Sequence, residues 1–219
     1  MKLPMEAPRI IGEVIHLQHD YRSYQEARDA AWKMLIDCEI TELPVSVSQI
    51  CKHYGWRLAS YRDGHKLIAA FGLSELVKET DGFCVYSGGR YYIFCDTDMP
   101  RARQRFTIAH EIGHIMLGHI GEGQCTRVNR EPAATDAPEE TQANQFAARI
   151  LAPAWVLHSI HALTPDRIAD VCEISMAAAT FRAERMELLE RRQKYLTHPL
   201  ERQVAEQFQS YIVKILGGE

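Results

Sequence analysis

Residues 105–119 read RFTIAHEIGHIMLGH, a largely apolar stretch that determines the architecture around it. Pro100 stands shortly before this stretch and Gly118 stands near its end. Proline is favoured in the first turn of a helix, and glycine just past the last turn. The pattern therefore predicts a helix over about residues 101–117. Two histidines and a glutamate inside such an apolar helix would be costly without a partner such as a metal ion.

The spacing of His110, Glu111 and His114 is typical of a catalytic zinc site. Positions i and i+4 of a helix lie on one face, so the two histidines can offer imidazole nitrogens to one tetrahedral ion. Glu111 can reach a water on that ion without becoming a ligand, as the motif H-E-x-x-H requires. We therefore predict that His110 and His114 bind Zn²⁺ and that Glu111 is the general base for hydrolysis of a peptide bond. A hydrogen-bonded pair of core histidines is the simpler alternative.

The spacing excludes a third histidine ligand of the H-E-x-x-H-x-x-G-x-x-H type. That motif requires glycine at position 117 and histidine at position 120, but the chain has Leu117 and Ile120 there. His119 lies about 140° round the helix from His114, so we expect it to cap the helix or to face solvent. The third ligand must then come from another segment.

A carboxylate at the start of a later helix is the alternative third ligand. The segment EETQANQFAARIL predicts a helix that begins at Glu140, and Glu140 and Asn144 share one face of it. We predict Glu140 as the third ligand, and Asn144 as the acceptor that fixes the tautomer of a liganding histidine. Ala143 and Ala147 leave room for a close approach of the two helices. Glu139 is the competing carboxylate, but it lacks this register with Asn144.

Apolar periodicity and turn signals predict further elements along the chain. They are helices over 24–38 and 47–54, a strand over 56–60, a hairpin over 82–96 that turns at 87–89, a loop over 121–139, and helices from 140 to the end with caps at Thr164 and Ser175. Residues 1–20 suit an arm or a surface strand better than an autonomous element. The strand over 91–95 is a candidate edge onto which an extended peptide could add.

The overall composition excludes several classes of protein. The formal net charge of −4 provides no general basic field for nucleic acid or an anionic membrane surface. Six cysteines without a C-x-x-C pair argue against a disulfide scaffold or a structural zinc knuckle. We find no secretory signal pattern and no apolar stretch of membrane-spanning length, so we expect a cytoplasmic location.

The two motifs together resemble those of a known family. RFTIAHEIGHIMLGH, followed by ETQANQFAARILAP over 140–153, is similar to the ImmA/IrrE metallopeptidases, and the similarity covers roughly residues 24–187. The sequence departs from the commoner pattern at Ile112 and Ala152, where leucine and methionine are usual. The segment 121–139 and the tail beyond Arg191 have no dependable counterpart.

The resemblance implies a fold, a cofactor and a partner. The fold is α+β: a zincin-like domain whose small antiparallel or mixed sheet packs on the motif helix, followed by a helical C-terminal region. The implied cofactor is Zn²⁺ on His110, His114 and Glu140, with Glu111 as base. The implied partner is a helix-turn-helix repressor, whose cleavage would release phage, mobile-element or stress genes. From the net negative charge we expect no direct binding of nucleic acid by this chain.

We predict three regions: an arm over 1–23, the metallopeptidase domain over 24–158, and a helical region over 159–219. The last region includes TPDRIADVCEISMAAATFRAERM, which has the rhythm of a helix-turn-helix and carries Arg182 and Arg185. A DNA-binding or partner-binding module is therefore one rival interpretation, although we favour packing or substrate docking. A metal-containing regulatory module without turnover is another. Cys125 could control the site as a thiolate ligand, but an ordinary thiol is the simpler interpretation.

Overall fold

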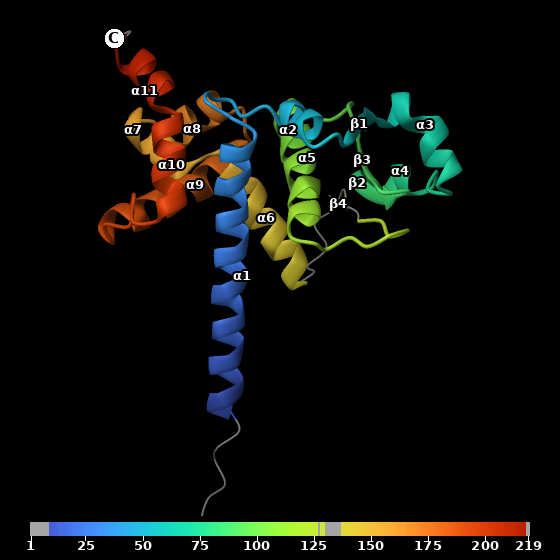
Figure 1. Ribbon diagram of the computed structural model, residues 1–219, viewed down its shortest axis with the longest axis horizontal. Helices are drawn as coiled ribbons and strands as arrows, with labels where there is room; N and C mark the ends of the chain where they lie inside the picture. The colour runs from blue at the N-terminus through green and yellow to red at the C-terminus, as the bar shows by residue number, and fades with distance from the viewer. Residues whose placement is uncertain (1–8, 127, 130–136, 218–219) are drawn as a thin grey trace, which may run out of the picture.

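The computed structural model describes residues 9–126, 128–129 and 137–217. It is an α+β structure in which a small mixed sheet lies on one side of helix α5 and most helices lie on the other (Figure 1). The strands are β1 (Arg57–Ser60), β2 (Thr80–Ser87), β3 (Arg90–Cys95) and β4 (Val128–Asn129). The helices are α1 (Arg9–Asp37), α2 (Val47–His53), α3 (Tyr61–Ala70), α4 (Leu76–Glu79), α5 (Arg101–Met116), α6 (Pro138–Leu151), α7 (Ala154–Ser159), α8 (Pro165–Cys172), α9 (Met176–Arg191), α10 (Pro199–Gln207) and α11 (Gln209–Leu216).

The sheet has the strand order β1-β3-β2-β4. Strands β2 and β3 form the predicted hairpin, and its turn residues Gly88 and Gly89 have φ of +58° and +74°, in the region that glycine favours. Strand β1 pairs with β3 in parallel, so β3 is a central strand. The prediction that residues 91–95 form a substrate-binding edge is therefore wrong, because both sides of β3 are already paired.

Helix α5 lies between the sheet and helix α6. Its central residues are buried, and it contacts β2 and β3 on one side and α6 on the other. A Cβ built on Gly113 would lie 3.1 Å from the Cα of Ala143, so the missing side chain lets α5 and α6 approach closely. Ala143 and Ala147 are both fully buried at this contact, as the predicted close packing of the two helices requires.

One hydrophobic core continues from the sheet-bearing half into the C-terminal helices. Leu35 of α1, Ile112 of α5, Phe146 of α6 and Phe208 between α10 and α11 all belong to it and are fully buried. Helix α1 packs against both α6 and α10. The helices after residue 159 therefore share their core with the preceding part, and the predicted boundary there stays a prediction.

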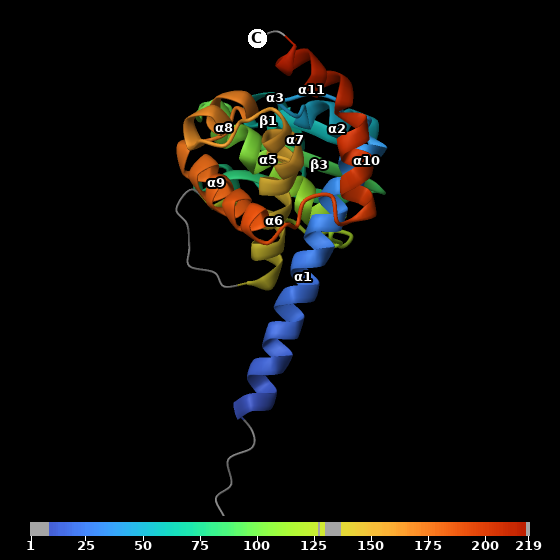
Figure 2. The same cartoon turned by 90° about the vertical axis from the view of Figure 1, so that its left-hand side faces the viewer.

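Helix α1 begins at Arg9, much earlier than the predicted start near Tyr24. Residues 9–23 are therefore helical rather than an extended arm or strand, and the first half of α1 projects away from the body of the molecule (Figures 1 and 2). The apolar periodicity that predicted this helix starts at Ala27, and Ala27, Ala31, Met34 and Leu35 are fully buried in the core. The rest of the predicted arm lies outside the described residues.

The segment predicted as a loop over 121–139 partly extends the sheet. Strand β4 pairs with β2, and Cys125 forms an isolated bridge with Val85. Residues 127 and 130–136 of this segment lie outside the described residues. Helix α6 begins at Pro138, two residues before the predicted start.

The remaining predicted helix starts are confirmed. The hydroxyl oxygens of Ser46, Thr164 and Ser175 accept hydrogen bonds from backbone N–H groups in the first turns of α2, α8 and α9. Helices α3 and α4 cover residues for which the sequence patterns made no prediction. Within the described ranges, the helices lack the combined length and hydropathy needed to span a bilayer.

Candidate metal centre

The structure brings His110, His114 and Glu140 together where α5 and α6 meet. Nε2 of His110 lies 3.2 Å from Oε2 of Glu140, and Nε2 of His114 lies 3.3 Å from Oε1 of the same carboxylate. The two Nε2 atoms are 3.0 Å apart. Ligands around zinc at bond lengths of about 2.0–2.1 Å are separated by about 3.3 Å in a tetrahedral arrangement. The observed separations are close to this value, with each imidazole nitrogen facing a different oxygen of Glu140.

Asn144 sets the protonation of His110. Its Oδ1 lies 2.9 Å from Nδ1 of His110 and accepts the hydrogen of that nitrogen. A neutral imidazole has one N–H, so Nε2 of His110 presents a lone pair towards Glu140. A lone pair and a carboxylate oxygen repel each other at this distance unless a cation or a proton lies between them. The donor set thus fits a divalent metal ion.

His119 orients His114 in the same way, and of the two predicted alternatives it caps the helix rather than facing solvent. Nδ1 of His119 lies 3.1 Å from Nδ1 of His114, and Nε2 of His119 lies 3.0 Å from Oε1 of Gln142. Gln142 donates in turn to Oε2 of Glu26 on α1, at 3.3 Å. The backbone N–H of His119 also bonds the carbonyl of His114, so the residue does cap the end of α5.

The chain of donors fixes the tautomers. The carboxylate of Glu26 only accepts, so Gln142 turns its amide nitrogen to Glu26 and its oxygen to His119. His119 therefore donates from Nε2 and accepts at Nδ1, which makes His114 the donor between the two rings. Burial lowers the pKa of His119, which favours a neutral ring. Nε2 of His114 is left with its lone pair facing Glu140.

The carboxyl group of Glu111 is fully buried beside the ligands. The hydroxyl of Thr126 donates to its Oε2, and the same hydroxyl oxygen accepts the backbone N–H of Cys84 at 3.0 Å. Oε1 of Glu111 has no hydrogen-bond partner within the described ranges. Cys125 is exposed and its thiol donates to the Thr126 carbonyl at 3.0 Å, so it stands outside the group of ligand atoms.

The electrostatic environment shifts the pKa values of Glu140 and Glu111 in opposite directions. When protons lie between the two rings and the carboxylate, hydrogen bonds from His110 and His114 hold the pKa of Glu140 well below its usual range. Burial raises the pKa of Glu111 and outweighs the opposing effects of the histidines and of Thr126. Burial lowers the pKa of His110, but the hydrogen bond to Glu140 and the negative charges of the two glutamates raise it by more. Glu140 is therefore suited to bind a cation and Glu111 to take up a proton.

The sequence patterns identified the three converging residues and Asn144, but they missed Thr126, Gln142 and the role of His119. Glu139, the competing carboxylate, is exposed. Thr126 lies within the predicted loop over 121–139, and no spacing rule connects it with Glu111. A comparison with curated protein sequences found no match.

Residues 73–191 match the sequence model of the peptidase family described as the IrrE N-terminal-like domain. The matched range contains the whole of α5 and α6, and with them every residue of the candidate metal centre except Glu26. It also contains the β2–β3 hairpin on which α5 packs. Because the match covers more than half of the chain and the structure has the α+β architecture that the resemblance implied, the chain belongs to the ImmA/IrrE family of metallopeptidases.

Proposed function

We propose that this chain is a zinc-dependent endopeptidase. His110, His114 and Glu140 would hold the ion, which when bound polarises the scissile carbonyl and lowers the pKa of the attacking water. The observation that carries the proposal is the convergence of two imidazole nitrogens and one carboxylate, whose nearest atoms lie 3.0–3.3 Å apart, beside a buried glutamate with one unpartnered oxygen. A purely structural metal site does not require a carboxylate oxygen that is free to accept a proton.

Glu111 would act as the general base. It would take a proton from the attacking water at Oε1 and later return it to the leaving amine. Its raised pKa, caused first by burial, makes it a better proton acceptor than an exposed glutamate. The hydroxyl of Thr126 holds Oε2, so the carboxyl group cannot turn freely and Oε1 stays directed to the reacting groups. Asn144 and His119 would keep the two imidazoles in the orientation that ligation needs.

The proposed substrate is a helix-turn-helix transcriptional repressor in the cytoplasm. This part of the proposal rests on the resemblance of the two motifs to the ImmA/IrrE pattern. Cleavage would relieve repression of phage, mobile-element or stress genes. We propose no direct contact between this chain and nucleic acid, because its net charge is −4 and Arg182, on the helix that would read DNA, is buried.

The test is incubation of the zinc-loaded chain with purified repressors encoded beside its gene, followed by mass spectrometry of the fragments. Glu111→Gln should keep its zinc and its fold but lose about two to four orders of magnitude in rate. Glu140→Gln should lose zinc and activity. Glu139→Gln is the matched control, because the neighbouring carboxylate is exposed and should leave both unchanged.

A different outcome would support a regulatory module without turnover. If Glu111→Gln inactivates the repressor as well as the wild type does, and no fragment appears with either protein, the chain acts by binding rather than by cleavage.

A further inference from the structure

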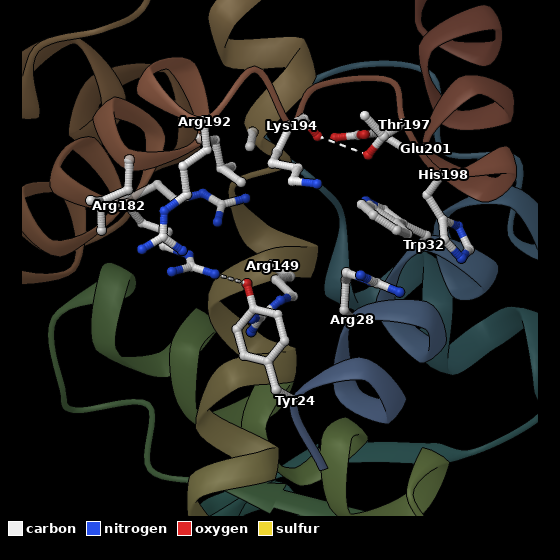
Figure 3. A pocket seen from close by; sticks show the side chains of 14 residues that line it. Tyr24, Arg28, Trp32, Arg149, Arg182, Arg192, Lys194, Thr197, His198 and Glu201 are labelled. Atoms are coloured by element: carbon white, nitrogen blue, oxygen red, sulfur yellow. Dashed lines mark hydrogen bonds between the residues drawn. The ribbon is translucent and has the colours of Figure 1, made fainter. Parts of the chain in front are cut away.

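A second candidate site lies near the C-terminal end of helix α6. It is a cavity of about 240 Å³ between α1, α6, α9 and the connection from α9 to α10. The cavity is notable for the charge of its walls. Six basic side chains line it: Arg28, Arg149, Arg182, Arg185, Arg192 and Lys194. Figure 3 shows Arg149, Arg182, Arg192 and Lys194 arranged around a common space above the ring of Tyr24. Glu201 is the acidic residue in the lining.

The environment of Arg182 is the strongest indication that this cavity binds an anion. Its residue is only 8% exposed, and its Nε is buried without a hydrogen-bond partner. Across the described residues no side chain forms an ion pair with it. Burial lowers its pKa to about 10, and the charge of Arg149 adds to this effect. A buried guanidinium without an ion-pair partner is unfavourable, so a fold that keeps one is suited to bind an anion.

Two further arginines are held in place by Tyr24. The guanidinium carbon of Arg149 lies 4.2 Å from the centre of the Tyr24 ring, and that of Arg185 lies 5.0 Å from it. Arg185 also donates to the Tyr24 hydroxyl. Burial raises the pKa of Tyr24, but the charges of Arg149 and Arg185 outweigh it, so the net shift is downwards. A phenol is a weak partner for two guanidinium groups, which leaves most of their charge uncompensated.

The nearby carboxylates do not balance this charge. Asp29 binds Arg28 at 2.7 Å and so accounts for one cation. Glu201 is buried, and its carboxyl accepts backbone N–H groups of Leu196 and Thr197. Five of the basic side chains in the lining therefore face a single carboxyl group. The excess is concentrated in a chain whose overall formal charge is −4.

We propose that this cavity binds the phosphate of a small soluble phosphate ester, such as a nucleotide. Several guanidinium groups from two helices suit a tetrahedral phosphate with at least two negative charges, because each can offer paired N–H donors to its oxygens. Trp32 lines the same cavity beside His198, with 5.1 Å between the ring centres. An aromatic ring attached to the phosphate would find an apolar surface there.

The position of the arginines speaks against a surface for duplex DNA. Arg182 and Arg185 are the two cations that gave α9 the look of a DNA-reading helix, yet both line the cavity. Phosphates of a duplex are reached by exposed side chains, whereas Arg182 is buried. A small anion can enter where a duplex cannot.

The site is separate from the metal centre. Arg149 and Glu140 stand nine residues apart on α6, about 14 Å along the helix axis. Binding of an anion in the cavity therefore does not need Glu111, and Glu111→Gln should bind it as the wild type does. This makes the test independent of the proposed peptidase activity.

The experiment uses the full zinc-loaded chain, with its zinc content checked before and after titration. Orthophosphate and adenosine diphosphate are titrated by calorimetry, and the shift in Tm is measured alongside, with sulfate at equal ionic strength as a reference. We expect one molecule of adenosine diphosphate per chain and a rise in Tm. Arg182→Met should weaken binding by roughly 30-fold or more, because a buried charge partner is lost.

A matched pair of surface variants controls for general electrostatics. Arg192→Gln should weaken binding several-fold, whereas Arg191→Gln removes the same charge one residue away, outside the cavity, and should have no effect. Without ligand, Arg182→Met should raise Tm by about 2–4 °C or more, since an unpaired buried charge is removed. That gain would show that the variant is folded.

Two results would overturn the proposal. One is an equal response of the wild type and of Arg182→Met to the small anions, which would place the binding elsewhere. The other is the absence of small-anion binding combined with salt-sensitive binding of duplex DNA that Arg182→Met and Arg192→Gln lose, which would make this face a nucleic-acid surface.

Discussion

The Nδ1 atoms of His114 and His119 lie 3.1 Å apart, which makes His119 the partner that orients the second histidine of the metal centre. The contact continues through Gln142 to Glu26 and so reaches from α5 through α6 to α1. Asn144 serves the first histidine in the same way from α6. Each proposed imidazole ligand is thus held from behind by a different residue.

His119→Ala should weaken zinc binding by about 10- to 100-fold, because the orienting partner of His114 is lost. Competition with a chromophoric chelator measures the affinity. His65→Ala is the control, since His65 is exposed on α3 and bonds only a local carbonyl. Equal zinc affinity of His119→Ala and wild type would show that His114 needs no such support.

Gly113→Ala should disturb the metal centre through the spacing of two helices. The new Cβ would lie 3.1 Å from the Cα and 3.2 Å from the carbonyl oxygen of Ala143, so α6 must move away by a few tenths of an ångström. Alanine gains about 1 kcal/mol of helix propensity over glycine, which offsets much of the roughly 1–3 kcal/mol cost of the tight contact. We therefore expect a small change in the free energy of unfolding, measured in urea, but a clear loss of zinc affinity. Unchanged zinc affinity would mean that Glu140 keeps its distance to the two histidines even when α6 moves.

Thr126→Val should lower kcat/KM by about tenfold, because Glu111 loses the hydroxyl that holds its Oε2. The shape of the side chain is nearly kept, so the fold should survive a cost of about 1–3 kcal/mol from the unpaired N–H of Cys84. Thr126→Ser keeps the hydroxyl and should restore the rate. If Thr126→Val has the same kcat/KM as Thr126→Ser, the hydroxyl of Thr126 has no role in the reaction.

Removal of metal should destabilise the chain. An ion that binds only the folded state adds about 4 kcal/mol when its concentration is 1,000 times its Kd. A chelator should therefore lower the Tm of the wild type but not that of His110→Ala, which lacks one of the three converging ligands. If calorimetric scans show the same fall in both proteins, the stabilising ion lies elsewhere.

Glu201→Gln should change how stability depends on pH. Burial raises the pKa of Glu201, so the stability that its protonated form contributes is full below the unfolded value of about 4.3 and is lost as pH rises through the higher folded value. The glutamine variant stays neutral. Relative to the wild type it should gain on the order of 1 kcal/mol between acid and neutral pH. Urea denaturation at pH 4 and pH 7 tests this, and a constant difference would contradict it.

Local spacing was enough for much of the metal centre. His110, Glu111 and His114 stand on one helix, where the positions of side chains follow from the helical repeat alone. Glu140 and Asn144 could be predicted for the same reason, because their i, i+4 register on a second helix matches one ligand with one orienting amide. The hairpin was also predictable, since two glycines with positive φ mark its turn.

Other features had no local signal. His119 was expected to cap the helix or to face solvent, and its backbone does cap the end of α5. No spacing rule showed that its ring turns back to His114 after the helix ends at Met116. Strand β3 looked like an edge, but which strands become neighbours depends on the parallel pairing with β1. The first half of α1 has weak apolar periodicity, and in the structure it projects away from the body of the molecule (Figures 1 and 2).

The amino-acid sequence by itself determined which residues form the candidate metal centre, because the proposed ligands, the proposed base and one orienting residue lie at fixed spacings along two helices. Only the tertiary structure decided which residues from other segments contact this group. Thr126 donates to Glu111, and Gln142 links His119 to Glu26. The arginines of α9 that line the cavity are also placed by the packing of separate helices. The physical reason is that spacing fixes positions within one element, whereas the packing of separate elements depends on the burial of the whole core.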